Sequence, residues 1–144
     1  MPNNLVPFIA QTAAGLRPLL TIYGNNYDTP DGTCLRDYIH IMDLAEAHVE
    51  ALKFLLNKPS GTFYDVFNVG TGQANSVLEI IRTFEEVSGV TLNCRLGERR
   101  LGDAAAVYAD ASKIEQHLGW RARRSMREGL TDSWRWQQSL SNRL

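Results

Sequence analysis

Two arginine-containing segments carry the residue types that could bind a phosphate group. They are Arg36-Asp37-Tyr38 and Arg99-Arg100-Leu101-Gly102-Asp103. A guanidinium donates paired hydrogen bonds to phosphate oxygens and stays charged at any working pH, so two of them suit a diphosphate. A neighbouring carboxylate can accept hydrogen bonds from ribose hydroxyls. The alternative is surface ion pairing with Asp37 and Asp103, and the residue types alone leave both interpretations open.

A second candidate is the glycine pair Gly70 and Gly72, which follows the apolar run 63–69. A strand that feeds Gly-x-Gly into a helix can hold dinucleotide phosphates at the helix N-terminus. The third glycine of that pattern is missing, because Asn75 stands there, and residues 90–94, about twenty positions downstream, contain no acid to bind a ribose hydroxyl. We therefore favour a plain strand-to-helix turn over a nucleotide-binding loop.

The sequence contains no acid–base pair of the Tyr-xxx-Lys type. In that spacing a lysine would lower the pKa of the phenol and make it a usable base, but none of the five tyrosines is followed by Lys at the fourth position. The three histidines, His40, His48 and His117, are scattered, and no Ser lies in a G-x-S-x-G pattern. We expect no metal site and no catalytic residue in this chain.

Helices and short strands are expected to alternate along the chain and to position these residues. Apolar spacing and glycine stops predict five helices: from Leu5 to a stop at Gly15, over 43–56, from 76 to 89, from 110 to 119, and a last helix carrying Met126, Leu130 and Trp134. Short apolar runs predict strands over 19–23, 63–69 and 91–96, of which the second would be covered on both faces. A turn is predicted over 29–32. This order predicts an α/β fold. The length of the chain is sufficient for a single core, and we expect one domain, residues 1–144.

Alternation from residue 36 to residue 41 predicts two different faces. Arg36, Tyr38 and His40 would form a polar face, and Ile39 and Ile41 a buried one.

Capping boxes, in which an Asp or Ser at the helix start pairs with a Glu three residues later, are predicted at Asp43 with Glu46 and at Ser76 with Glu79. The helix after the first box carries an apolar stripe, which consists of Leu44, Ala47, Ala51, Leu52 and Leu55.

The composition excludes several classes of protein. Fifteen Lys and Arg against sixteen Asp and Glu give a net charge of -1, and the densest basic segment, residues 121–127, is interpreted as a solvated helix start, so we expect no nucleic-acid partner. No apolar stretch approaches the roughly 18–20 residues of a membrane span, so no membrane partner is expected. Residues 5–14 follow no Lys or Arg and contain Pro7, which argues against an export signal.

The spacing of Cys34 and Cys94 suits two buried or partly buried thiols in a reducing compartment, and we expect a cytoplasmic protein.

Six segments follow one another in a distinctive order: Asn3-Asn4-Leu5-Val6-Pro7, Leu20-Thr21-Ile22-Tyr23-Gly24-Asn25, Asp28-Thr29-Pro30-Asp31-Gly32-Thr33, Arg36-Asp37-Tyr38-Ile39-His40-Ile41-Met42-Asp43-Leu44, Phe67-Asn68-Val69-Gly70-Thr71-Gly72 and Arg99-Arg100-Leu101-Gly102-Asp103. In order and spacing they resemble UDP-glucose 4-epimerases, which belong to the extended short-chain dehydrogenase/reductases. The resemblance covers essentially the whole chain, through Trp134-Arg135-Trp136-Gln137, but only the C-terminal part of that family. It implies a C-terminal substrate-binding part, with the Rossmann NAD-binding part missing.

The resemblance also implies roles for individual residues. Asn4 would contact the ligand near its diphosphate and sugar, Thr21, Ile22 and Tyr23 would line the uracil, Arg36 and Arg100 would hold the diphosphate with Tyr38 beside them, and Asp103 would bind ribose hydroxyls. In the family the NAD loop, the Ser and the Tyr-xxx-Lys group belong to the amino-terminal part. NAD is therefore implied as the cofactor of the complete enzyme, and this chain alone is expected to be inactive.

The implied reaction interconverts UDP-glucose and UDP-galactose. Hydride passes from sugar C4 to a tightly held NAD and returns to the other face after the 4-keto sugar has turned. A firm diphosphate anchor lets the sugar turn without leaving. The implied partners are a UDP-hexose and, for the complete enzyme, a second copy in a homodimer.

Two positions depart from the family pattern. Leu101 stands where Pro or Glu is usual, and we expect little effect because that side chain need not touch the ligand. Val107 stands at a position that is Tyr in family members restricted to plain hexoses and a smaller residue in members that also accept N-acetylhexosamines. The smaller Val predicts that UDP-N-acetylglucosamine is accepted as well.

Two rival interpretations remain. One is a non-catalytic UDP-sugar-binding or interaction module. The other is a fragment of a related sugar-nucleotide decarboxylase or dehydratase. His40 in Tyr38-Ile39-His40 favours an epimerase over this second interpretation. Because the predicted strand over 63–69 would be an edge without its neighbours, we also expect marginal stability or self-association.

Overall fold

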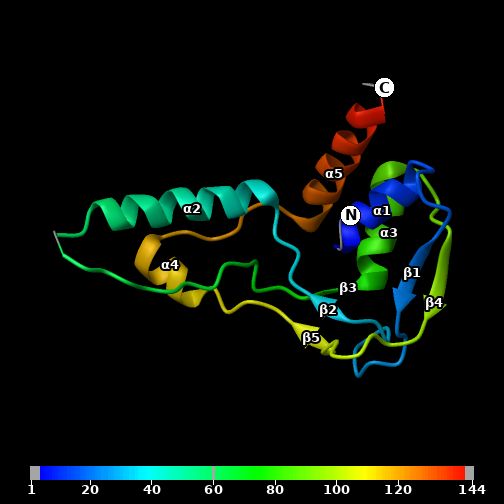
Figure 1. The fold of residues 1–144 in the computed structure, drawn as a ribbon, viewed down its shortest axis with the longest axis horizontal. Coiled ribbons are helices and arrows are strands. Elements are labelled where there is room, and N and C mark those ends of the chain that lie inside the picture. Colours follow the sequence, from blue (N-terminus) through cyan, green and yellow to red (C-terminus); the bar gives the residue numbers. More distant parts are fainter. Residues whose placement is uncertain (1–3, 60, 142–144) are drawn as a thin grey trace.

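The computed structural model of the chain describes residues 4–59 and 61–141. These residues form the expected α/β arrangement of helices and short strands (Figure 1). The elements are α1 (Leu5–Ala13), β1 (Leu20–Tyr23), β2 (Leu35–Arg36), α2 (Ile41–Leu56), β3 (Asn75–Ser76), α3 (Val77–Ser88), β4 (Cys94–Gly97), β5 (Ala106–Val107), α4 (Ser112–Leu118) and α5 (Met126–Ser141). In Figure 1, α1, α3, α5, β1 and β4 gather on one side, while α2 and α4 extend away from them. We call α2, α4 and the apolar segment 63–69 the arm.

The strands form two small sheets. β1 pairs with β4 in parallel, with Leu20 opposite Cys94 and Tyr23 opposite Gly97. β2 lies between β3 and β5, antiparallel to β3 and parallel to β5. β4 starts at Cys94, later than the predicted Thr91, because its length is set by the four residues of β1 that it pairs with.

The main core lies between α1, α3, α5 and β1. Ile80 and Phe84 of α3 are fully buried in it. Trp134 of α5 packs edge-on against Phe84, with 5.8 Å between the ring centroids. Met126, Leu130 and Trp134 all pack into this cluster, which confirms the apolar face predicted for the last helix.

Both ends of α3 are as predicted. The Ser76 side chain accepts a hydrogen bond from the Glu79 backbone N–H (3.0 Å), and the Glu79 carboxylate accepts one from the Ser76 N–H (2.6 Å). Gly89 follows the last turn in the left-handed conformation, with φ 69°. Such capping interactions depend on neighbours in sequence, so the sequence alone could identify them.

The predicted strand over 63–69 is wrong. This segment contains no strand, and Tyr64 and Val66 are 85% and 57% exposed. A strand needs hydrogen-bonding neighbours, and no strand of the described residues pairs with this segment. Phe63 instead packs edge-on against Phe54 of α2, with 5.8 Å between the ring centroids.

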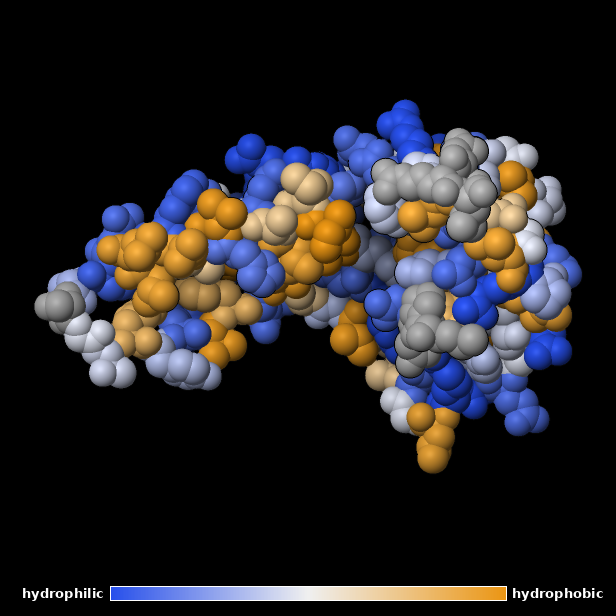
Figure 2. All heavy atoms as spheres, turned by 45° about the horizontal axis from the view of Figure 1, so that its top comes forward, coloured by the Kyte–Doolittle hydropathy of each residue, from blue (hydrophilic) through white to orange (hydrophobic). Residues whose placement is uncertain are grey.

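Much of the apolar surface of the arm is uncovered. Figure 2 shows hydrophobic side chains gathered over the arm. Ala47 of the predicted α2 stripe is buried in a small cluster with Ile114 and Trp120, whereas Leu52 and Leu55 are 55% and 49% exposed. The buried side chains therefore form two clusters rather than the single core expected from the length of the chain.

The faces predicted for residues 36–41 are wrong from His40 onward. β2 ends at Arg36 and α2 begins at Ile41, so the alternation does not continue. His40 is buried, and its Nδ1 accepts a hydrogen bond from the Met42 backbone N–H (3.0 Å) at the start of α2. Ile41 is 69% exposed because it lies on the outer side of the first helical turn.

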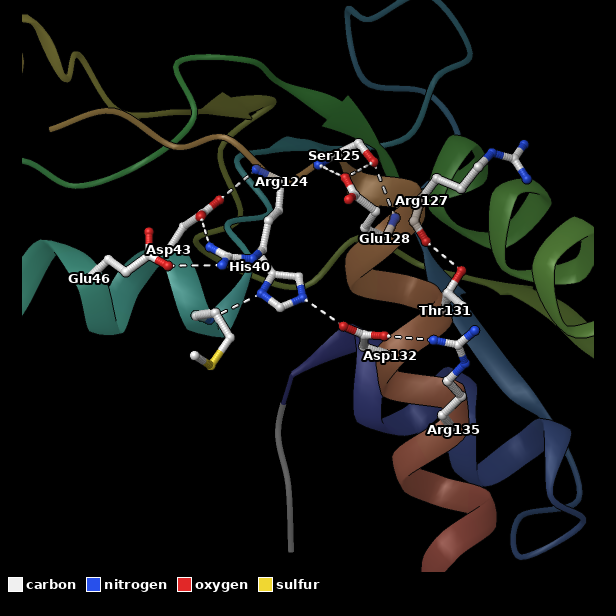
Figure 3. A network of polar contacts seen from close by, with 11 residues as sticks. His40, Asp43, Glu46, Arg124, Ser125, Arg127, Glu128, Thr131, Asp132 and Arg135 are labelled. Atoms are coloured by element: carbon white, nitrogen blue, oxygen red, sulfur yellow. Dashed lines mark hydrogen bonds and ion pairs between the residues drawn. The ribbon is translucent and has the colours of Figure 1, made fainter.

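Asp43 is a buried ion-pair partner rather than a helix cap. Its carboxylate pairs with the Arg124 guanidinium and accepts hydrogen bonds from the backbone N–H groups of Arg123 (3.1 Å) and Arg124 (2.9 Å). Arg124 also pairs with Glu46 at 2.8 Å. The interpretation of residues 121–127 as solvated is therefore wrong for Arg124, which fixes the start of α2 beside the start of α5 (Figure 3). Burial disfavours the charged form of Asp43, but the contacts from Arg124 and Arg123 hold its pKa below the ordinary value.

Candidate functional site

A cavity of about 1460 Å³ is lined by residues of α1, β1, α5 and the segment that contains β2. Its lining includes eight residues that the sequence had singled out: Asn4, Thr21, Ile22, Tyr23, Arg36, Tyr38, Arg100 and Asp103. The fold thus brings together four segments that are far apart in the chain. The ninth candidate, Val107, does not line this cavity and is 53% exposed.

Two guanidinium groups converge within the cavity. Arg36 Nη2 lies 3.7 Å from Asp103 Oδ1, and Arg100 Nε donates to Asp103 Oδ2 at 2.9 Å. Two positive charges therefore face one carboxylate, and the excess positive charge favours an anionic ligand. With an effective dielectric of 20, each close charge pair with a phosphate contributes on the order of 4 kcal/mol before desolvation.

Different contacts hold the two arginines in place. Arg36 Nη1 donates to the backbone oxygens of Leu35 (2.8 Å) and Ala104 (2.9 Å), so this guanidinium bridges β2 and the chain before β5. The Arg100 guanidinium carbon lies 5.0 Å from the centre of the Tyr23 ring. These contacts use only some of the five N–H donors of a guanidinium, which leaves others for a ligand.

Arg99 does not line the cavity and instead packs against the turn after β1. Its Nε donates to Asn26 Oδ1 (2.7 Å), and its guanidinium carbon lies 4.0 Å from the centre of the Tyr27 ring. Gly24 has a φ of 82°, and a Cβ there would overlap both Tyr27 and Arg99. The turn after β1 therefore needs glycine, and the two adjacent arginines have separate tasks.

Tyr38 stays protonated at neutral pH. Burial raises the pKa of its phenol to about 12, although the positive charge of Arg36 opposes the shift. The hydroxyl can donate or accept a hydrogen bond in the cavity, but it is not a base.

The cavity lining includes residues that no motif in the sequence indicates. Arg95 Nε donates to Thr21 Oγ1 at 3.2 Å, because these two residues are paired between β4 and β1. Met126, Asp132 and Trp136 of α5 form another wall. No sequence signal identifies them, since strand pairing and helix docking over such separations are set by the tertiary structure.

His40 connects this wall to the start of α2. Because its Nδ1 accepts the Met42 N–H, the proton of the neutral ring is on Nε2, which lies 3.3 Å from Asp132 Oδ2. Arg135 Nη1 lies 3.5 Å from the other oxygen of Asp132. Figure 3 shows the His40 ring between the first turn of α2 and the side of α5.

The glycine loop binds a carboxylate of the chain itself. The backbone N–H groups of Thr71 and Gly72 donate to Asp37 Oδ2 at 2.9 and 3.1 Å. The amides that would hold a phosphate are thus already bonded, which agrees with the interpretation of this loop as a structural turn.

Cys34 and Cys94 are free thiols, buried and half-buried respectively, as predicted. Burial raises the pKa of the Cys94 thiol, with a smaller contribution from the charge of Glu85. Within residues 4–59 and 61–141, no three His, Cys, Asp or Glu side chains group as metal ligands would. No helix in the same ranges has the length and apolar character needed to cross a bilayer.

Comparison with known proteins gives one family and a consistent set of relatives. The family model described as GDP-mannose 4,6 dehydratase matches residues 1–133. UDP-glucose 4-epimerase of Bacillus subtilis is 49% identical over 142 residues, which are 99% of this chain and 41% of that protein. The enzyme of the same name from Drosophila melanogaster is 49% identical over 141 residues, 98% of this chain and 40% of that one. The chain thus spans about two fifths of the length of these relatives.

Solved structures agree in fold. UDP-glucose 4-epimerase of Stenotrophomonas maltophila, solved with NAD and formylated UDP-arabinopyranose, superposes with a TM-score of 0.93 at 46% identity over 99% of this chain and 42% of its own. The Bifidobacterium longum epimerase, solved with NAD+ and UDP, has a TM-score of 0.89 at 43% identity over 99% of this chain and 42% of its own. The UDP-Glc/GlcNAc 4-epimerase of Campylobacter jejuni has a TM-score of 0.84 at 38% identity over 96% of this chain and 42% of its own.

Proposed function

We propose that this chain, which belongs to the family described as GDP-mannose 4,6 dehydratase, is the UDP-sugar-binding part of a UDP-glucose 4-epimerase. The complete enzyme would interconvert UDP-glucose and UDP-galactose with NAD. The observation that carries this proposal is the convergence of Arg36 and Arg100 on Asp103 in one cavity. The UDP ligand of the Bifidobacterium longum relative supports the choice of a uridine diphosphate.

In the proposed complex the two arginines hold the diphosphate, and Asp103 accepts hydrogen bonds from the ribose hydroxyls. The Tyr23 ring would flank the uracil, since it lies next to Arg100 and lines the cavity. Tyr38, kept protonated by burial, would donate a hydrogen bond near the phosphates. This chain therefore supplies binding and orientation, and the anchored diphosphate lets the sugar end turn without dissociating.

The residues of this chain do not fit the pyrophosphate of NAD. The amides of Thr71 and Gly72 are bonded to Asp37, and the sequence has no Tyr-xxx-Lys pair. We assign NAD, and the group that takes the hydroxyl proton, to the three fifths of a relative's length that lie outside this chain. The 144 residues on their own are accordingly expected to show no turnover.

The substrate range follows from Val107. In β5 this residue pairs with Arg36 of β2, so its side chain lies beside a residue that lines the cavity. Val107 itself does not line the cavity, so the proposal rests on size: Val is smaller than the Tyr of the family pattern, and the Campylobacter jejuni relative, a UDP-Glc/GlcNAc 4-epimerase, supports acceptance of both sugars.

The substitution Val107→Tyr tests this substrate range. We expect it to reduce turnover of UDP-N-acetylglucosamine at least tenfold, about 1.4 kcal/mol, while turnover of UDP-glucose changes little. Equal turnover of UDP-N-acetylglucosamine before and after the substitution would show that Val107 does not determine the substrate range.

A hybrid enzyme tests the function itself. Residues 1–144 would replace the matching segment of the Bacillus subtilis epimerase, which leaves the rest of that enzyme to supply NAD binding. We expect the hybrid to convert UDP-galactose to UDP-glucose, and the unaltered Bacillus subtilis enzyme is the positive control. A folded hybrid that binds UDP without turnover would favour a non-catalytic binding module instead.

The same proposal includes a homodimer for the complete enzyme and a cytoplasmic location, both of which rest on the family resemblance. Sedimentation of the hybrid at two concentrations measures the first, and fractionation of the producing cells measures the second.

A further inference from the structure

We propose that Asp37 is a positioning residue that holds Arg36 and Tyr38 in the orientation needed to bind a diphosphate. The inference rests on the proposed function, because it concerns the same cavity. It also explains why glycines stand at positions 70 and 72, since this loop does not have the pattern of a nucleotide-binding loop.

The Asp37 carboxylate accepts hydrogen bonds from four donor groups in two separate segments. On one side the Thr71 backbone N–H (2.9 Å), the Thr71 hydroxyl (2.6 Å) and the Gly72 N–H (3.1 Å) donate to it. On the other side the Ala109 N–H donates to it at 3.3 Å. The side chain therefore joins the loop before β3 to the segment after β5.

The small sheet needs such a junction because its strands are very short. β2, β3 and β5 have two residues each, so their backbone ladders supply few hydrogen bonds. Asp37 immediately follows β2, the central strand, and its contacts continue the sheet on both sides. Asp37 lines the cavity together with the residues on either side of it, Arg36 and Tyr38. Their orientation thus depends on the peptide that the carboxylate fixes.

The glycine loop is shaped for this carboxylate. A Cβ at Gly70 would overlap the Asp37 carboxylate and the Ala109 side chain, so the close approach requires glycine. Gly72 has a φ of 71°, which also favours glycine, and this conformation points its N–H at the same carboxylate. Each glycine therefore has a structural reason that involves no phosphate.

The four donors also settle the electrostatics of the cavity. A free carboxylate next to Arg36 would repel a diphosphate and compete for the guanidinium. In this structure the Asp37 carboxylate accepts hydrogen bonds from N–H and O–H groups instead of pairing with Arg36. The carboxylate that both arginines contact is that of Asp103.

The test uses Thr71, which donates to Asp37 and does not line the cavity. In the hybrid enzyme, Thr71→Val removes the hydroxyl donor at constant shape, and Thr71→Ser retains it. Asp65→Asn is a control that removes a carboxylate from an ion pair on the arm, with Lys113. Asp37→Asn is the stronger change, and Thr71→Val remains informative if that variant does not fold.

We expect Thr71→Val to raise the KM for UDP-galactose about tenfold, or 1.4 kcal/mol, with kcat within about twofold of the parent. Thr71→Ser and Asp65→Asn should keep the parent KM. An unchanged KM in Thr71→Val, no rescue by Ser, or equal losses in all three variants would overturn the positioning role. If the parent hybrid has no activity, the proposed function fails separately, and the calorimetric affinity of the same variants for UDP decides the role of Asp37.

Discussion

Replacement of Arg124 by Gln should destabilise the protein far more than replacement of a nearby surface arginine. Arg124 pairs with Asp43, whose side chain is 0% exposed, and with Glu46 at 2.8 Å. The variant would leave the buried carboxylate without its cation. The two backbone N–H groups that donate to Asp43 would remain.

The size of the effect follows from these contacts. Loss of one partner of a buried ion pair costs about 3–5 kcal/mol. Arg124 is 33% exposed and Asp43 keeps two donors, so we expect the lower end of that range, about 3 kcal/mol. For a chain of this size that corresponds to a decrease of roughly 10 °C in Tm.

The assay is urea unfolding of the 144-residue chain, and Arg127→Gln is the matched control. Arg127 pairs with Glu86 on the surface, where the two side chains are 57% and 60% exposed, so its loss should cost about 0–1 kcal/mol. Equal destabilisation by the two variants would refute the assignment of Arg124 to a buried ion pair.

Acid provides an independent check on the same pair. The pKa of Asp43 is lowered in the folded protein, so its stabilising contribution is fully present above about pH 4 and is lost as the pH falls through the folded value. The stability difference between the parent and Arg124→Gln should therefore narrow below about pH 4. A constant difference down to about pH 2 would contradict this explanation.

Two further predictions concern other parts of the fold. Ser76→Ala removes the cap of α3 and should lower the free energy of unfolding by about 1–2 kcal/mol. Ser76→Thr keeps a hydroxyl and should retain most of the parent stability. A loss in Ser76→Ala below about 1 kcal/mol, measured by urea unfolding, would contradict the capping role. Replacement of Tyr64 and Val66 by Ser should reduce self-association of the chain in sedimentation velocity, because both side chains are exposed on the arm. Unchanged association would mean that the arm is not the contact surface.

Features that depend on neighbouring residues could be predicted from the sequence. The cap of α3 by Ser76 and Glu79 and the end of this helix at Gly89 follow from interactions within one helical turn. The residue types of the arginine segments suited a phosphate but left ion pairing open as well; the structure brings Arg36 and Arg100 into one cavity and pairs both with Asp103.

Features that depend on distant partners could not be predicted. Asp43 has the spacing of a helix cap, but Arg124, some eighty residues later, takes its carboxylate into the interior. The pairing of Thr21 with Arg95 likewise depends on the contact of β1 with β4. The segment 63–69 has the composition of a buried strand, yet composition does not supply the neighbouring strands that it requires.

The diphosphate site is tested most sharply by a double-mutant cycle on Arg36 and Arg100, in which the binding of UDP and of uridine to the hybrid enzyme is measured. We expect each Arg→Ala substitution to raise the Kd for UDP about tenfold or more, with a coupling energy above about 0.5 kcal/mol. The Kd for uridine, which has no phosphate, should stay within about twofold. Equal loss of affinity for both ligands, or an effect of only one arginine, would contradict the claim that the two side chains hold one diphosphate.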